Sequence, residues 1–554
     1  MSVLTTIEAR VSQSAITKVT RLFNGTIADV LQELLQNARR AGAQEIRINL
    51  ADRKGEPILV IRDDGSGIAD PAVLVTLGHS GWGADISRRE DPAGMGVFSL
   101  AGHHVIVRSH SSKIGGWQVD ISADAWQGGV PLLVEPAAIE SGTEISLALP
   151  ESWATHLEDA AKRAALYFPL PVYFGEHLLP RQDFLADAHR VEHWHGCRIG
   201  VFRHKDQGGA EAPRINFHGV GVACRLPMVS EIGSFGKWTA RVDIVDAPTL
   251  QLVLPARKEM VENAALGDLR KAVARSIYRT IAFEPSHRLS FKDWQQAAEL
   301  GVQLAEADAS LDAWIALTAD SHGREVGERV STGPMLIMPS HDPDIEQGLA
   351  QILGDANPIG ARLVRAESAF EGYGWYDRLP RIAWLQFLAE RNGAVLRYGE
   401  DQLLPDDYES GRVSSLEVEL TIAVGGGEQT KTQSRRFPLP MLVCRNDGYG
   451  LDDAIILVAE GADVSPTALA WLIETSIFCA DDDHDCDSWE TQHRNFEEAA
   501  RDLATTLLLG EEDALVERIR VALSENVQWL IPDGRSLTLL ATRQALTLTL
   551  AEAR

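Results

Sequence analysis

The chain has 554 residues, a formal net charge of −27, and hydrophobic and charged fractions of 45% and 24%, as in an ordinary soluble globular protein. This length predicts three or four domains. No basic start followed by an apolar core is present, so we expect no secretory signal. No apolar run approaches the ~20 residues that cross a bilayer, so we expect no membrane span. Five scattered cysteines favour a reducing cytoplasm over a disulfide framework.

The acidic residues are concentrated in the C-terminal half. Residues 1–290 contain 31 Lys/Arg and 33 Asp/Glu, whereas the remainder contains 21 and 46. Such a charge distribution repels nucleic acids and anionic membranes at long range, which favours a protein partner. The nearly neutral middle region still allows a local basic groove.

The first predicted elements lie in the N-terminal quarter. Residues 1–25 contain spaced apolar positions typical of a helix or an N-terminal strap. Apolar residues between Ile27 and Leu35 then recur at helical spacing. Glu33 and Asn37 stand one turn apart, so both project from one face of this helix.

Two glycine-containing segments follow. The apolar run 58–61 predicts a strand that ends at Asp63-Asp64-Gly65-Ser66-Gly67, where an acid and two glycines let a flat ligand approach the backbone. Gly94-Met95-Gly96-Val97-Phe98-Ser99 is a glycine-rich turn entering an apolar helix, a place where backbone N–H groups hold phosphate. Taken singly, each segment is more often an ordinary turn.

In this order and spacing, and with Ser141-Gly142-Thr143-Glu144-Ile145 behind them, the three segments resemble the N, G1 and G2 boxes and the Gly-Thr strand of the GHKL ATPase superfamily. That superfamily includes gyrase, the ninety-kilodalton heat-shock chaperone, histidine kinases and MutL. The resemblance implies a Bergerat-type α/β sandwich over residues 1–150, one mixed sheet with helices on one face, which binds ATP and Mg²⁺.

The resemblance also implies a role for each residue. Asn37 would hold Mg²⁺, Glu33 would be the general base for the attacking water, and Asp63 would accept the adenine amino group with help from Thr143. Gly65 and Gly67 would make room for the base. Backbone amides would bind the phosphates, namely those of Gly94, Met95, Gly96, Val97 and Phe98. Residues 77–92 would form a mobile lid, in which Ser80 and Gly81 would contact the nucleotide. His79 in the lid is expected to be a solvated loop residue.

Residues 151–290 predict a second domain. A helix over 157–167 ends before Pro169 and Pro171, then four strands precede a long helix over 265–281. This order resembles the ribosomal-protein-like β-α-β transducer domain that follows the ATPase module in gyrase, MutL and the chaperone. By that resemblance either Arg257 or Lys258, which precede Glu259-Met260, would contact the γ-phosphate; alignment on Glu259-Met260 favours Lys258.

The remaining residues resemble no known family. We predict an α+β domain over 291–465, with helices at 291–317, 345–353 and 381–391 and an exposed hairpin turn at Gly425-Gly426-Gly427 and the following residues up to Ser434. Predicted strands cover 335–339, 361–365, 394–398, 416–424 and 436–443. From Pro466 a mainly helical segment is expected to reach residue 554. The acidic run 481–487 is interpreted as a solvated loop, and we assign no metal to it.

No P-loop, zinc-binding helix, Cys-x-x-Cys pair or nucleophile elbow is present. Glu33, and the lack of a phosphoacceptor helix before it, favour hydrolysis over kinase activity.

We therefore expect an ATP-gated homodimeric clamp that acts on a protein client, as the heat-shock chaperone does. The alternative is a MutL- or microrchidia-like nucleic-acid clamp in DNA maintenance or defence against foreign DNA, with a basic groove formed by Arg198, Arg203, His204, Lys205 and Arg214. A nucleotide-switched scaffold with negligible turnover is a third interpretation.

Overall fold

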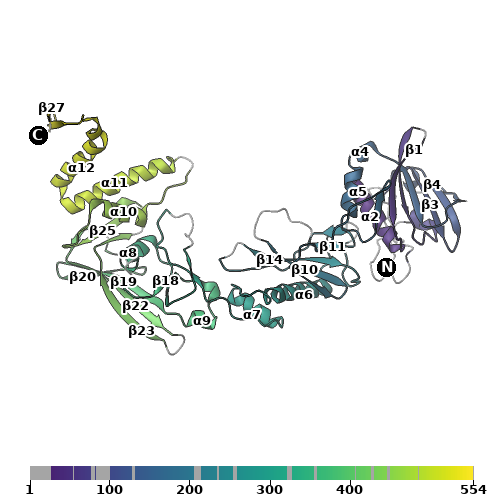
Figure 1. The fold of residues 1–554 in the computed structure, drawn as a ribbon, viewed down its shortest axis with the longest axis horizontal. Helices are drawn as coiled ribbons and strands as arrows, with labels where there is room; N and C mark the ends of the chain where they lie inside the picture. Colours follow the sequence, from purple (N-terminus) through teal and green to yellow (C-terminus); the bar gives the residue numbers. More distant parts are fainter. Residues whose placement is uncertain are drawn as a thin grey trace, which may run out of the picture. The chain divides into compact units, whose positions relative to one another are not determined.

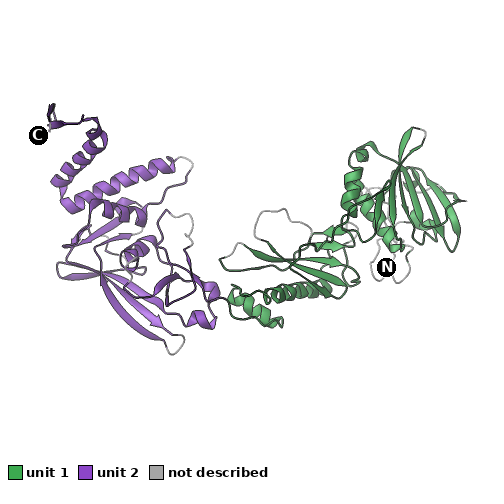
Figure 2. Cartoon of the chain, viewed as in Figure 1, with its two compact units in different colours: residues 1–307 green, residues 308–554 purple. Residues whose placement is uncertain are grey.

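A computed structural model of the chain forms two compact units, residues 1–307 and 308–554 (Figure 2). It contains several sheets and helices, which confirms the predicted mixed α+β, multidomain character. The residues that the structure describes are 26–53, 55–76, 82, 100–127, 131–204, 214–233, 236–253, 259–320, 327–354, 358–402, 404–405, 407–425, 430–445, 450–483 and 486–552.

The first unit contains an eight-stranded sheet with the strand order β5-β4-β3-β6-β2-β1-β7-β8 (Figure 1). Neighbouring strands are antiparallel except β1 and β7, which are parallel. Alternate residues of β6 are buried, as in a strand with one face against a core. The strands are β1 (Ile46–Arg53), β2 (Glu56–Asp63), β3 (Val105–Ser111), β4 (Gly115–Ile121), β5 (Val134–Pro136), β6 (Thr143–Ala148), β7 (Val172–Phe174) and β8 (His177–Leu178).

Helices α2 (Ile27–Arg40) and α5 (Leu157–Ala165) pack together and share one apolar core with this sheet. The Thr26 side chain accepts a hydrogen bond from Asp29 N–H and so caps the start of α2. Val30, Leu31 and Leu35 lie on the buried stripe, with exposed fractions of 1% or less. This stripe fixes the rotation of α2, which leaves Glu33 and Asn37 only partly buried beside it.

A second, six-stranded sheet follows in the same unit, with the order β12-β11-β14-β10-β9 and β13 paired with β14. Helix α6 (Ala264–Ile281) is capped by Asn263 and packs its apolar residues against this sheet. The other elements are α4 (Glu151–Ala154), β9 (Arg190–Trp194), β10 (Cys197–His204), β11 (Ile215–Phe217), β12 (Val220–Val222), β13 (Val229–Ser230), β14 (Lys237–Ile244) and α7 (Phe291–Glu299).

The second unit is built on a six-stranded sheet of order β18-β17-β19-β22-β23, with β20 on β19, and a three-stranded sheet β21-β25-β24. Its strands are β15 (Leu311–Asp312), β16 (Arg329–Val330), β17 (Met335–Met338), β18 (Arg362–Arg365), β19 (Arg381–Arg391), β20 (Ala394–Tyr398), β21 (Gly411–Val413), β22 (Ser415–Val424), β23 (Lys431–Pro438), β24 (Met441–Arg445), β25 (Ala454–Ala459), β26 (Arg535–Ala541) and β27 (Leu546–Glu552). Its helices are α8 (Pro343–Leu353), α9 (Gly374–Asp377), α10 (Pro466–Ile477), α11 (Trp489–Leu509) and α12 (Glu511–Asn526).

Four predictions for residues 291–554 are wrong. The segment 381–391 is not a helix but strand β19, which pairs with β17, β20 and β22 in the middle of the sheet. The predicted helix at 291–317 ends at Glu299. The single strand expected over 436–443 is divided between β23 and β24. The last described elements are the hairpin strands β26 and β27 rather than helices.

The expected hairpin is confirmed in part: β22 and β23 pair from Val424 and Lys431 onward, but residues 431–434, predicted as turn, belong to β23. All five cysteines are free. Within the described part of the chain no helix combines the length and the hydropathy that crossing a bilayer requires.

Candidate functional site

Helix α2 carries the two predicted catalytic groups, Glu33 and Asn37. Arg40, one turn beyond Asn37, donates a hydrogen bond from Nη1 to Asn37 Oδ1 at 3.2 Å. The same nitrogen lies 4.0 Å from Glu33 Oε1, and the exposed fractions of the Arg40 and Glu33 side chains are 4% and 18%. A single buried guanidinium therefore contacts both groups.

Asp63 is the last residue of β2, a strand that lies between β6 and β1 inside the sheet. Burial raises the pKa of Asp63 to about 6, although the backbone N–H groups of Gly65 and Thr143 oppose the shift. Burial disfavours the charged carboxylate because little water remains to solvate it. A polar group so placed is suited to receive a hydrogen-bond donor from a ligand.

The two glycines after Asp63 leave no room for a side chain. A Cβ on Gly65 would lie 2.7 Å from the Ala41 Cβ, and one on Gly67 would lie 1.8 Å from the His110 carbonyl oxygen. Gly67 also has a φ of +68°, a conformation that favours glycine. The turn therefore packs closely against Ala41 and His110.

Thr143 lies directly opposite Asp63 in the pairing of β6 with β2. Its hydroxyl is buried and lies 3.0 Å from the Ser109 hydroxyl, which also donates to the Gly142 carbonyl oxygen at 3.1 Å. Ser109 accepts a hydrogen bond from Ile68 N–H at 2.9 Å, so it connects the Asp63 turn to the Gly142-Thr143 corner.

The Asp63 turn also contacts the end of α2. Ser66 N–H donates to the Ala41 carbonyl oxygen at 2.8 Å, and Ala41 N–H in turn donates to Asn37 O at 2.9 Å. Asp64 accepts hydrogen bonds from the N–H groups of Gln44 and Glu45, which fixes the link between α2 and β1. The structure thus brings Glu33, Asn37, Asp63, Gly65, Gly67 and Thr143 into one region of the first unit.

The remaining predicted site residues lie outside the described residues: Ser80, Gly81, Gly94, Met95, Gly96, Val97, Phe98, Arg257 and Lys258. The lid histidine His79 and the N-terminal residues 1–25 lie outside them as well. The residues on either side of 254–258 are hydrogen-bonded to each other: Val253 N–H donates to Glu259 O at 2.8 Å, and Leu252 pairs with Met260. The segment that carries Arg257 and Lys258 is therefore bounded by paired backbone just before α6.

Sequence reasoning did not find Arg40 and Ser109. Arg40 follows Asn37 by three residues and Glu33 by seven, a spacing that puts all three on one helical face and that was available in the sequence. Ser109 has no comparable signal, because its role depends on the pairing of β3 with β6.

The residues of the predicted basic groove are largely neutralised. Arg198 pairs with Asp183 and Asp243, and Arg203 pairs with Glu231 and Glu284. The pKa of His204 is lowered by burial and then by the charges of Arg241 and Arg214. Lys205 lies outside the described residues.

Comparison of the sequence with models of protein families and with curated proteins gives no match. Across the part of the chain described here, no group of three or more His, Cys, Asp or Glu side chains is arranged to hold a metal ion. In the acidic run, Gln492 donates hydrogen bonds to the carbonyl oxygens of Asp481 and Asp487, which ties this loop to α11.

Proposed function

We propose that this protein binds ATP with Mg²⁺ and hydrolyses it, as a member of the GHKL superfamily with a Bergerat-type sandwich over residues 1–150 and a transducer-like domain over 151–290. The observation that carries the proposal is the contact of the Asp63 turn with the end of α2 through Ser66 N–H and Ala41 O. It joins the adenine-binding candidate to the helix that bears Glu33 and Asn37.

The described residues are compatible with ATP and Mg²⁺. The partly buried Asp63 carboxylate can accept the amino group of a flat base, and the glycines beside it pack against Ala41 and His110, which fixes the position of the turn. Asn37 Oδ1 is a hard oxygen ligand of the kind that Mg²⁺ prefers. Bound Mg²⁺ would supply charge neutralisation at the phosphates.

Glu33 would orient a water molecule and accept its proton during attack on the terminal phosphate. Arg40 fixes the Glu33 carboxylate and the Asn37 amide relative to each other, so both reach the reacting groups in one geometry. Arg257 or Lys258 would stabilise the negative charge that develops during transfer.

Phosphate release by wild type, Glu33→Gln and Asp63→Asn tests this proposal. Glu33→Gln should retain ATP binding and lose about 10²–10⁴-fold in turnover, because only proton transfer is removed. Asp63→Asn should lose ATP binding itself. Unchanged turnover in Glu33→Gln would reject the catalytic assignment, and wild type that takes up no ATP would reject the whole proposal.

The sensor assignment has a separate test. Lys258→Ala and Arg257→Ala should each be compared with wild type for ATP affinity and turnover. The residue that contacts the γ-phosphate should lower turnover much more than affinity. Equal loss of both quantities in both variants argues against a sensor at either position.

A protein client is favoured over a nucleic acid. The ion pairs of Arg198 and Arg203 with four carboxylates remove much of the charge that a phosphate backbone would need. We propose that the protein acts as a homodimeric clamp that ATP closes. DNA binding that falls steeply between low and moderate salt would instead support the nucleic-acid clamp.

A further inference from the structure

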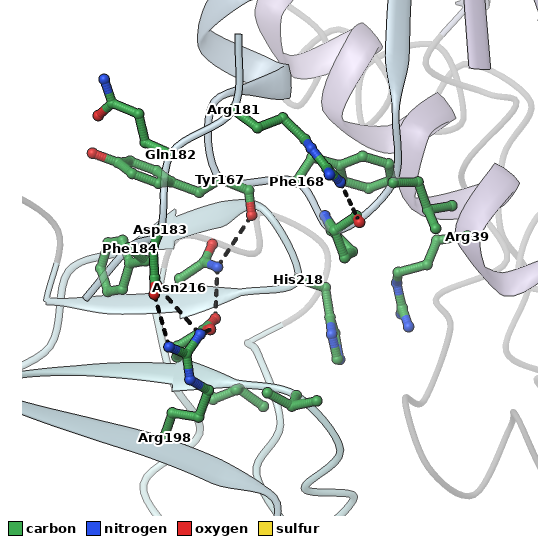
Figure 3. Close-up of a pocket in the computed structure, with 15 residues that line it drawn as sticks. Arg39, Tyr167, Phe168, Arg181, Gln182, Asp183, Phe184, Arg198, Asn216 and His218 are labelled. Atoms are coloured by element: carbon green, nitrogen blue, oxygen red, sulfur yellow. Dashed lines mark hydrogen bonds and ion pairs between the residues drawn. The ribbon is translucent and has the colours of Figure 1, made fainter. Parts of the chain in front are cut away.

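A cavity lies in the first unit, and its lining differs from the residues assigned to ATP. It has a volume of about 560 Å³ and opens between the end of α2, the backbone after α5 and the ends of β11 and β14 (Figure 3). None of Glu33, Asn37, Asp63 or Thr143 lines it. Its size suits a small organic ligand, and junctions between sheets are common places for such sites.

One side of the cavity is a fixed polar network. Arg198 makes two hydrogen bonds to the Asp183 carboxylate, at 2.8 and 3.2 Å, and a third to Asp243 at 3.1 Å. Asn216, which is 4% exposed, donates to Asp243 at 2.8 Å and to the Tyr167 carbonyl oxygen. Both acidic side chains of the lining are therefore engaged by Arg198, whose guanidinium holds the pKa of Asp183 below its usual range.

The other side carries two further guanidinium groups and an imidazole ring. In Figure 3, Arg39, Arg181 and the ring of His218 lie on the side away from Arg198. Arg181 donates from Nη1 to the Pro169 carbonyl oxygen at 2.6 Å, which orients its guanidinium beside the cavity. The lining thus contains three guanidinium groups and two carboxylates, so its net charge is positive and favours an anion.

Apart from Gln182, the rest of the lining is mainly apolar and includes the rings of Tyr167, Phe168 and Phe184 together with Leu170 and Ile244. Tyr167 and Phe184 meet edge to face with ring centroids 5.1 Å apart. Aromatic walls bind flat apolar bodies, whereas guanidinium groups bind carboxylate or phosphate through paired N–H donors.

We propose that this cavity binds a small planar organic anion, an aromatic ring that bears a carboxylate or phosphate group. Arg39 and Arg181 bind the anionic group, and the aromatic side chains contact the ring. The site is connected to α2, because Gln36 accepts a hydrogen bond from Arg39 Nε at 3.3 Å and donates one to the His218 carbonyl oxygen. His218 has a φ of +53°, an uncommon conformation for a residue other than glycine. The hydrogen bond from Gln36 to its carbonyl oxygen stabilises the turn in this conformation.

Calorimetry with three probes on the full chain, without nucleotide, tests the proposal. The probes are 2-naphthoate, 2-naphthyl phosphate and the uncharged 2-naphthamide. The anionic probes should bind and the amide should bind about tenfold more weakly, the loss expected for a charge-assisted hydrogen bond. A preference between the two anions identifies the group that natural ligands carry. Absence of binding by both anions, or equal binding of the amide, overturns the proposal.

Variants locate the probe. Arg39→Gln and Arg181→Gln should each weaken naphthoate binding by about tenfold. Arg108→Gln, which changes an arginine on β3 outside the cavity, should leave it unchanged, as should Asp63→Asn. Wild-type affinity in either cavity variant, or loss of the probe in Asp63→Asn, overturns the assignment. Hydrogen exchange should also show slower exchange of amides in α2 and in 167–170 when naphthoate is bound; unchanged exchange there counts against the site.

Discussion

Arg40 Nη1 donates a hydrogen bond to Asn37 Oδ1, the atom that we assign to Mg²⁺, and it does so from a side chain that is 4% exposed. The same guanidinium lies beside Glu33. A fixed positive charge repels an arriving cation, and partial burial strengthens this repulsion because water screens it poorly. In the proposed site, Arg40 would therefore both organise Glu33 and Asn37 on α2 and oppose Mg²⁺ binding.

Arg40→Met should lower the Mg²⁺ concentration for half-maximal ATP hydrolysis by about tenfold, equivalent to ~1.4 kcal/mol. The free energy of unfolding should fall by about 1–3 kcal/mol, because Asn37 and Glu33 lose a buried donor. Arg47→Met, which removes an arginine that is 41% exposed on the neighbouring strand, is the matched control. An unchanged or higher Mg²⁺ requirement in Arg40→Met contradicts the repulsion.

ATP binding should depend on pH through Asp63. The adenine amino group is a donor, so it requires the ionised carboxylate, and the pKa of this group is raised to about 6. Affinity measured by calorimetry should be constant above pH 7 and fall by about tenfold for each pH unit below 6. A midpoint near 4, the ordinary range for an aspartate, would show that burial does not control this carboxylate.

The same group should reduce stability at neutral pH. Its pKa is higher in the folded chain than in the unfolded chain, so between pH 4 and 6 the folded state binds more protons and the free energy of unfolding decreases as pH rises. Asp63→Asn has no charge to bury, and it should be more stable than wild type by about 1–3 kcal/mol at pH 8. Below pH 4 the two proteins should have equal stability. Equal denaturation midpoints at pH 8 contradict this account.

Local spacing was sufficient to predict helix α2 and the turn after Asp63, whereas the roles of their residues come from the family resemblance and stay a prediction. Glu33 and Asn37 follow from helical periodicity, and the Asp63 turn follows from a strand that ends at glycines. Arg40 was not predicted, although its spacing from Glu33 and Asn37 puts it on the same helical face. The basic groove suggested by the charges of residues 151–290 could not be judged from the sequence for a different reason. Only the fold reveals that Arg198 and Arg203 face carboxylates distant in sequence.

Strand β19 shows where periodicity fails. Its apolar residues Ile382, Leu385 and Leu388 recur at helical spacing, yet neighbouring strands on both sides satisfy its backbone. A strand inside a sheet has apolar residues on both faces, and a short apolar run of that kind cannot be distinguished from a buried helix by pattern alone. The C-terminal hairpin was missed for a different reason: the alternating Leu and Thr residues of β27 are a strand pattern that the prediction of a helical segment overlooked, and β26 and β27 pair only with each other.

The close packing of the Asp63 turn can be tested at Gly67. Gly67→Ala would put a Cβ 1.8 Å from the His110 carbonyl oxygen and would also strain a φ of +68°. We expect a loss of at least ~3 kcal/mol in the free energy of unfolding, measured by urea denaturation. Gly55→Ala is the control, because its φ is +89° but nothing lies within 4 Å of the added Cβ. Its cost should be only the backbone strain, about 1 kcal/mol. Similar costs at both positions would mean that the turn is loosely packed.

The second unit contains a fully buried carboxylate, that of Glu346 on α8, whose side chain is 0% exposed. It pairs with Arg365 at 3.1 Å and accepts hydrogen bonds from Leu317 N–H at 2.8 Å and Trp314 Nε1 at 3.2 Å. Glu346→Gln leaves the Arg365 charge buried without its counterion, so the free energy of unfolding of this unit should fall by about 3–5 kcal/mol.

Glu328→Gln is the matched control, because Glu328 pairs with Arg362 at a similar 3.3 Å but is 81% exposed. An exposed pair contributes little, and this variant should lose less than about 1 kcal/mol. Urea denaturation followed by tryptophan fluorescence measures both, and ATP affinity serves as the readout for the first unit. Because Glu346 contacts only residues of the second unit in these interactions, the affinity should be unchanged in both variants. Equal destabilisation by the two variants would show that burial does not set the strength of the Glu346 pair, and lost ATP affinity would show that the two units fold as one.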